Sequence, residues 1–194
     1  ALARVGSEKL VLEEGTARFS REGMELDLGG IAKGYAIDVA IRAIRDHGGE
    51  SALVDIGGDM RLIGTRGDGT PWKIRVRTPP RMNLGKPIYL KVTGAAVTTS
   101  GDYERYFKVG ERHFSHIIDP RTGRPVDTVP SSTVIAPTAA MADGLATATS
   151  VLGAEEGVQV VESVEGAECL LMVREGEDEV RIVATSGFSD YRYE

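Results

Sequence analysis

The sequence predicts an α+β domain in which a largely antiparallel sheet carries two to three packed helices. Short runs of alternating apolar and polar residues, typical of half-buried strands, dominate the chain. Most connections between them are of hairpin length, whereas parallel strands need long crossover segments. Only two or three stretches show the apolar spacing of a helix.

Composition narrows the functional classes. The 194 residues, 41% of them hydrophobic, suffice for one sizeable domain or two small ones. The net charge of −6, without a basic stripe, argues against nucleic-acid binding. No run approaches the ~18 apolar residues of a membrane span, so no transmembrane segment is expected. Cys169 is the single cysteine and lies in an apolar run, which predicts a buried, inert thiol and no internal disulfide.

The N-terminal elements follow from pattern and turn residues. Two short strands are expected within residues 8–20, and another at residues 24–28. A helix is expected from about Ile31 to His47, followed by the left-handed cap residues Gly48 and Gly49. Its buried face is formed by Ile37, Ala40, Ile41 and Ile44.

The rest of the chain continues the hairpin-rich pattern. Strands are expected at residues 52–56, 72–76, 88–92, 95–99, 131–136, 170–173 and 180–184. Residues 103–109 and 112–118 form a predicted hairpin around Gly110, and prolines make residues 119–125 an ordered turn. Two helices are expected at residues 139–152 and 154–163, the first with Thr138 as its N-cap.

The first candidate site is the run DLGGIAKG at residues 27–34. Gly29 and Gly30 let the backbone approach a ligand closely, and the following helix offers free N–H groups to an anion such as phosphate. Lys33 adds positive charge. The run matches neither the dinucleotide fingerprint nor the P-loop, and a tight turn without a ligand remains the alternative. A second glycine pair at residues 57–58, one helix later, is placed to line the same cleft.

The second candidate site is the helix of small residues at 139–148. Asp143 and Thr147 are four residues apart and therefore share one helix face. Their carboxylate and hydroxyl oxygens suit Mg²⁺, which takes few protein ligands together with substrate phosphates. The alternative is a helix that packs tightly on the sheet, with Asp143 solvated.

The third candidate is His116, which stands at a strand end three residues before Asp119. A histidine there can bind phosphate or move a proton, or it can simply hydrogen-bond within the turn. A hydrolase triad of Ser100, His116 and Asp119 is disfavoured. Thr98 and Asp102 stand where the nucleophile-elbow pattern needs glycines.

Four ordered stretches together resemble the ApbE family, the flavin transferases. They are DLGGIAKG at 27–34, LVDIGGD at 53–59, TSGDYER at 99–105 with SHIIDPRTG at 115–123, and ADGLATA at 142–148. The resemblance runs from about Val11 to Gly187. It implies a T-fold-like α+β domain and Mg²⁺-dependent transfer of FMN from FAD to a Thr or Ser hydroxyl of a target flavoprotein subunit, with release of AMP. It also implies a location in the cell envelope, periplasmic or on the outer face of the cytoplasmic membrane.

The resemblance also implies roles for individual residues. The metal ligands would be the Asp143 side chain, the Thr147 hydroxyl and the main-chain carbonyl of Ala32. His116 would sit at the diphosphate, and His116 or Asp143 would assist the loss of the acceptor proton. The flavin or phosphate part would be lined by Gly30, Lys33, Gly34, Ser100, Gly101, Asp102, His116 and Asp119.

One departure from the family concerns length. Residues 1–194 are expected to form the flavin transferase domain without the family's N-terminal part, which contributes further FAD contacts. A protein that binds FAD, or hydrolyses it to FMN and AMP, without transfer activity is therefore the runner-up. A third interpretation, the nucleotide-binding βαβ domain of a dehydrogenase, is based on the glycine run alone. The hairpin-rich middle of the chain argues against it, because parallel strands need crossover helices.

Overall fold

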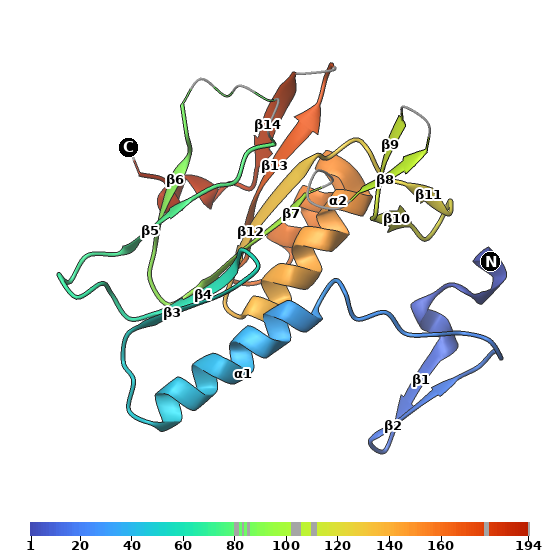
Figure 1. Cartoon of the computed structure of the whole chain (residues 1–194), viewed down its shortest axis with the longest axis horizontal. Coiled ribbons are helices and arrows are strands. Elements are labelled where there is room, and N and C mark those ends of the chain that lie inside the picture. The colour runs from blue at the N-terminus through green and yellow to red at the C-terminus, as the bar shows by residue number, and fades with distance from the viewer. Residues whose placement is uncertain are drawn as a thin grey trace.

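The centre of the computed structural model is a six-stranded sheet (Figure 1). The structure describes residues 1–79, 82, 84, 86–101, 106–109, 112–176 and 179–193. In the order β14-β13-β12-β7-β4-β3, every neighbouring pair is antiparallel. The strands are β3 (Ala52–Ile56), β4 (Asp59–Ile63), β7 (Ala96–Gly101), β12 (Ser131–Ala136), β13 (Glu168–Arg174) and β14 (Val180–Ala184). The predicted antiparallel α+β class is confirmed.

Two helices cover one face of this sheet. Helix α1 (Ala32–Asp46) packs on β3 and β4, and α2 (Ala139–Glu162) packs on β7, β12 and β13. The two helices also contact one another. The core between helices and sheet includes Ile37, Ile41, Ala96, Val134, Ala142, Ala146 and Leu171. Small side chains on α2 let it lie close to both the sheet and α1.

A third layer covers the opposite face. It consists of the hairpin of β5 (Trp72–Arg75) and β6 (Tyr89–Val92) and the 3-10 helix η3 (Phe188–Tyr191). The second core includes Leu62, Ile74, Leu90, Val97, Ile135, Met172 and Phe188. The alternation of Ala96 and Val97 between the two cores shows that the central sheet is buried on both faces.

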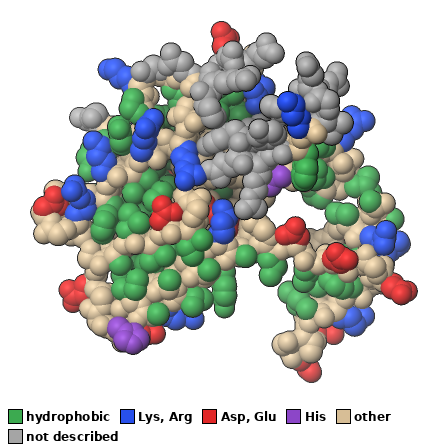
Figure 2. Space-filling model, in the orientation of Figure 1, with side chains coloured by type: hydrophobic (Ala, Val, Ile, Leu, Met, Phe, Trp, Pro, Cys, Tyr) green, Lys and Arg blue, Asp and Glu red, His purple; other side chains and the backbone are tan. Residues whose placement is uncertain are grey.

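Three small hairpins lie outside these layers. Strands β8 (Tyr106–Val109) and β9 (Arg112–Ser115) form one hairpin, and β10 (Ile118–Asp119) and β11 (Arg124–Pro125) form another (Figure 1). The turn of the second hairpin contacts α2 through Arg121. The N-terminal segment holds η1 (Leu2–Arg4), η2 (Ser7–Lys9), β1 (Leu10–Glu13) and β2 (Thr16–Phe19). Figure 2 shows an open hollow between this N-terminal segment and the body of the molecule.

Several local predictions are confirmed. The chain leaves α1 at Gly48, whose φ is 81°, and the Gly49 N–H donates to the Ile44 carbonyl at 2.9 Å. Thr138 caps α2 by accepting from the Met141 N–H at 3.2 Å. Gly153 (φ 81°, ψ −172°) interrupts α2 between the two predicted helices. Cys169 is buried, and burial raises the pKa of its thiol to about 12.

Two strand predictions were wrong or incomplete. Residues 24–28 form no strand; the side chains of Leu26 and Leu28 are exposed, and the Asp27 carboxylate accepts from the Gly29 N–H at 2.7 Å. The alternating apolar pattern of residues 24–28 suits a strand, but among the described residues no neighbouring strand pairs with this segment. Strand β4 was not predicted, because its inward positions include Asp59 and Arg61 and so break the apolar pattern. No helix in the described part of the chain is long and apolar enough to cross a membrane.

Candidate functional site

The first turn of α1 meets the first turns of α2. The Gly34 N–H donates to Asp143 Oδ2 at 3.0 Å, and Asp143 is only 3% exposed. A Cβ on Gly34 would lie 2.2 Å from the Ala139 carbonyl oxygen. The two backbones therefore come closer than any residue but glycine allows. This contact joins the predicted phosphate loop to the predicted metal helix.

The same loop also reaches Thr147, one turn further along α2. A Cβ on Gly30 would lie 3.3 Å from Thr147 Oγ1 and 3.4 Å from Cγ2. Ala32 lies in the chain midway between Gly30 and Gly34. The structure thus brings the loop that carries Ala32 against the helix face that carries Asp143 and Thr147, the three residues predicted to hold the metal.

The chemistry of these donors fits a hard cation. Among the described residues, the Asp143 carboxylate accepts the single hydrogen bond from Gly34. A buried carboxylate is costly without further compensation, and a bound cation supplies it. Carboxylate and hydroxyl oxygens are ligands that Mg²⁺ prefers. Within the described ranges, no group of three or more His, Cys, Asp or Glu side chains gathers at one point. Substrate phosphates and water would complete the ligands of such an ion.

Lys33 connects the two glycine turns. Its Nζ lies 2.5 Å from Oδ2 of Asp59, which is 1% exposed and opens β4 directly after Gly57 and Gly58. The Lys33 side chain itself remains 40% exposed. The ion pair fixes the Lys33 ammonium beside the start of α1, with the Asp59 carboxylate as its counterion. This contact brings the segments that carry the two glycine pairs together, and the shared cleft stays a prediction.

Two features near the site were missed by sequence reasoning. The Arg77 guanidinium lies against Gly58, where a Cβ would approach Nη2 to 2.4 Å. Arg77 reads as an ordinary polar position next to a half-buried strand, so no sequence signal marks it. It adds a second cation beside the turn that precedes Asp59.

The other missed feature is Asp38, which fixes α1 to the start of α2. Its carboxylate accepts from the N–H groups of Ala139 at 2.9 Å and Ala140 at 3.0 Å, and it also pairs with Arg61. Burial raises the pKa of Asp38, but the hydrogen bonds from Ala140 and Ala139 and the ion pair with Arg61 lower it more, so the pKa lies below its usual value. This cap sets the position of the helix that carries Asp143.

The remaining predicted residues lie on neighbouring elements. Ser100 and Gly101 end β7, where Ser100 pairs with Ser132 of β12, and Ser132 Oγ lies 2.6 Å from Thr149 Oγ1 of α2. Ser100 follows Ala96 by four residues and so faces the helix layer. Asp102 lies outside the described residues.

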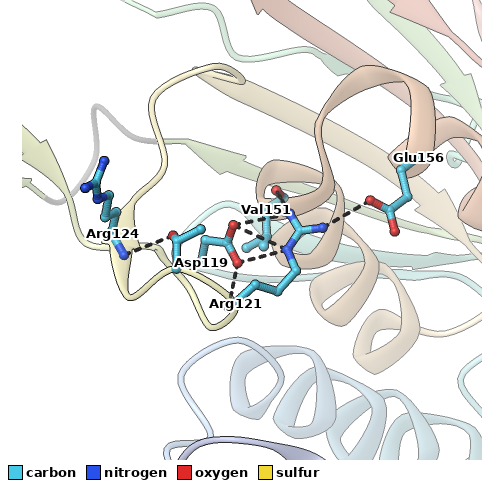
Figure 3. A network of polar contacts seen from close by, with 6 residues as sticks. Asp119, Arg121, Arg124, Val151 and Glu156 are labelled. Atoms are coloured by element: carbon cyan, nitrogen blue, oxygen red, sulfur yellow. Dashed lines mark hydrogen bonds and ion pairs between the residues drawn. The ribbon is translucent and has the colours of Figure 1, made fainter. Parts of the chain in front are cut away.

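His116 is exposed between β9 and β10, where the flanking Ile117 N–H donates to Ser115 Oγ at 3.1 Å. The Asp119 carboxylate accepts from Arg121 Nε at 3.1 Å and from its backbone N–H at 2.8 Å (Figure 3). These side-chain and backbone hydrogen bonds hold the pKa of Asp119 below its usual value. Because its carboxylate is engaged by Arg121, Asp119 gives no support to the hydrolase triad.

These contacts define an α+β domain with a candidate site for a phosphate ligand and a hard cation. Comparison with known proteins identifies the family of this domain. A family model described as the ApbE family matches residues 1–171. The FAD:protein FMN transferase of Vibrio cholerae is 36% identical over 190 residues, covering 97% of this chain and 56% of that protein. That of Treponema pallidum is 35% identical over 184 residues, covering 90% of this chain and 50% of that protein.

Solved structures give the same result. The ApbE protein of Thermotoga maritima superposes with a TM-score of 0.86 at 35% identity, over 100% of this chain and 62% of that one. The flavinyl transferase ApbE of Pseudomonas stutzeri gives 0.83 at 33% identity, over 98% and 58%. The chain belongs to the ApbE family. It spans about half the length of the curated relatives it matches.

Proposed function

We propose that this chain carries the metal and diphosphate site of an FAD:protein FMN transferase. In this reaction a Thr or Ser hydroxyl of a target flavoprotein receives FMN from FAD, and AMP is released. The observation that carries the proposal is the contact of residues 30–34 with Asp143 and Thr147. The names of the relatives, and the family to which the chain belongs, support the same reaction.

The chemical step is a displacement at phosphorus. The acceptor oxygen bonds to the phosphorus of the FMN half, the bond from that phosphorus to the bridging oxygen breaks, and AMP leaves with the electron pair. A Mg²⁺ ion held by Asp143, Thr147 and the Ala32 carbonyl would supply positive charge to the diphosphate oxygens. Lys33, anchored by Asp59, adds a second positive charge at the same place.

The acceptor hydroxyl must lose its proton as it attacks. We assign the role of proton acceptor to His116, because this residue is exposed, whereas Asp143 is buried and accepts a hydrogen bond from Gly34. The Gly34 N–H keeps the Asp143 carboxylate oriented toward the loop. The expected free N–H groups at the start of α1 are largely taken, since Ala32 donates to the Leu28 carbonyl at 2.8 Å and Gly34 donates to Asp143. The phosphates would therefore depend on Lys33 and the metal ion more than on these donors.

The test is a product assay with FAD, Mg²⁺ and a purified flavoprotein subunit that is known to carry FMN on threonine. AMP release together with covalent flavin fluorescence on the subunit supports transfer. AMP with free FMN identifies the hydrolytic alternative at the same site, because water has then replaced the acceptor hydroxyl. Absence of AMP from the wild-type chain, with FAD and Mg²⁺ saturating, would contradict the proposal. Glu155 is exposed on α2, the helix that carries Asp143, so the Glu155→Gln variant serves as a control and should react like the wild type.

The cell-envelope location implied by the family resemblance forms part of this proposal. Fractionation of cells that express the complete gene product tests it. Recovery in the periplasmic or membrane fraction agrees with the proposal, and recovery only with cytoplasmic markers contradicts it.

A further inference from the structure

Helix α2 is broken at Gly153, less than two turns beyond Thr147, the second candidate metal ligand on this helix. Gly153 adopts φ 81° and ψ −172°, a conformation outside the helical region. A break of this kind leaves carbonyl groups of the preceding turn without their regular N–H partners. It also gives the first part of α2 a C-terminal end of its own, which attracts a cation.

Arg121 binds at this break and joins three pieces of the chain (Figure 3). Its Nη2 donates to the Val151 carbonyl at 3.4 Å, just before the break. Its Nη1 donates to Glu156 Oε2 at 3.2 Å, just after it. Its Nε and Nη2 also donate to the two oxygens of Asp119, at 3.1 and 3.2 Å. All three guanidinium nitrogens are therefore engaged, an arrangement that a lysine ammonium cannot reproduce.

The position of this contact on α2 relates it to the active site. Asp143, Thr147 and Val151 follow one another at intervals of four residues and so share one helix face. Val151 lies one turn, about 6 Å along the axis, beyond Thr147. His116 lies three residues before Asp119, a span of at most about 10 Å. The turn that Arg121 holds is thus the part of the chain that leads directly to His116.

The segment between His116 and the turn is itself held in place, so fixing the turn also fixes His116. Ser115 and Ile117, on either side of His116, are buried at 7% and 8% exposure. Residues 118–119 pair with residues 124–125 in the β10–β11 hairpin, and the Gly123 N–H closes the turn on the Asp119 carbonyl at 2.7 Å. A hairpin closed in this way moves as one unit, so its contact with α2 determines where His116 stands.

We propose that Arg121 is a positioning residue for the flavin-transfer reaction. It clamps the β10–β11 hairpin to the break in α2 and so fixes His116 relative to Asp143 and Thr147. The inference rests on the proposed function for its catalytic consequence. Arg121 and Glu156 are each more than half exposed, so their ion pair adds little to global stability. Its loss is expected to release the hairpin without unfolding the domain.

The experiment measures AMP release from FAD with Mg²⁺ for the wild type and for Arg121→Ala, Arg121→Lys, His116→Ala and the Arg121→Ala/His116→Ala double variant. Arg124→Ala is the matched control, because Arg124 lies in the same hairpin and, within the described residues, its backbone is bonded but its side chain is not. Arg121→Ala should lower kcat about tenfold or more, since a small displacement of a catalytic group is costly, with the KM for FAD changed less than about threefold. Arg121→Lys should recover only part of the lost kcat. The kcat of Arg124→Ala should match that of the wild type.

The double variant separates positioning from an independent role. If Arg121 acts through His116, the double variant is as slow as His116→Ala alone. Losses that multiply in the double variant, or a wild-type kcat for Arg121→Ala, would overturn the inference while leaving the proposed function intact.

A wild-type chain that releases no AMP would instead refute the proposed function. In that case the contact of Arg121 with α2 is tested by the protection of backbone amides from hydrogen exchange over residues 117–123. Loss of protection in Arg121→Ala supports it, and unchanged protection overturns it.

Discussion

Replacing Gly34 by alanine tests the closest contact in the site. The added Cβ would lie 2.2 Å from the Ala139 carbonyl oxygen and 2.7 Å from the Ala140 Cα, whereas ordinary contact begins at 3.4 Å. Both neighbours are backbone atoms, so no rotamer change relieves the clash. The two helices must separate by about 1 Å, in an interior that is as closely packed as a crystal.

The energetic effect combines three contributions. Alanine gains about 1 kcal/mol in helix propensity over glycine. Overpacking costs about 1–3 kcal/mol. Weakening the Gly34 hydrogen bond to the buried Asp143 carboxylate costs about 1.5–3 kcal/mol. We expect a net loss of about 3 kcal/mol in the free energy of unfolding, which lowers Tm by about 6–12 °C in a chain of this size.

Thermal unfolding followed by circular dichroism measures this effect. The matched control is Gly144→Ala on α2, where a Cβ would meet nothing within 4 Å. Its helix-propensity gain of about 1 kcal/mol should raise Tm by about 2–4 °C. If Gly34→Ala matched or exceeded the wild-type Tm, the close approach of α1 to α2 would be refuted.

Three further predictions concern stability and reactivity. Asp38→Asn should lower the free energy of unfolding at pH 7 by about 2 kcal/mol. The pKa of Asp38 in the folded state lies below its ordinary 3.8, so its contribution to stability is present above the unfolded pKa and is lost as the pH falls through the folded pKa. The difference in urea unfolding between variant and wild type should therefore shrink toward pH 3, and a pH-independent difference would count against the cap. Cys169, buried and with its pKa raised to about 12, should react with iodoacetamide at pH 8 only after unfolding; rapid alkylation of the native chain would contradict its burial. Gly153→Ala should cost about 1–3 kcal/mol in urea unfolding, since the residue sits in a region of φ and ψ reserved for glycine, and a neutral effect would argue against the break in α2.

Sequence reasoning succeeded where a signal is local. Thr138 caps its own helix three residues on, and Gly48 ends α1 where the helical pattern stops. Asp143 and Thr147 share a face because helix periodicity alone requires it. These features depend on a few consecutive residues, so pattern and turn chemistry were sufficient.

It failed where partners come from distant segments. Asp38 caps a helix that begins 101 residues later in the chain. The Lys33–Asp59 pair and the position of Arg77 on Gly58 likewise depend on how separate elements pack. A polar side chain in a helix or strand looks like a solvated position until its partner is known. For the same reason β4 was missed, since Arg61 faces inward to meet Asp38.

The metal and diphosphate site can be tested by measuring FAD binding through flavin fluorescence, with and without Mg²⁺. We propose that Asp143 and Thr147, held against residues 30–34, form this site. Asp143→Asn keeps an acceptor for the Gly34 N–H but removes the charge a cation needs, and Glu155→Gln on the same helix is the control. We expect Mg²⁺-dependent binding that Asp143→Asn weakens at least about tenfold and Glu155→Gln leaves unchanged. Binding that is indifferent to Mg²⁺ and to Asp143→Asn would contradict it.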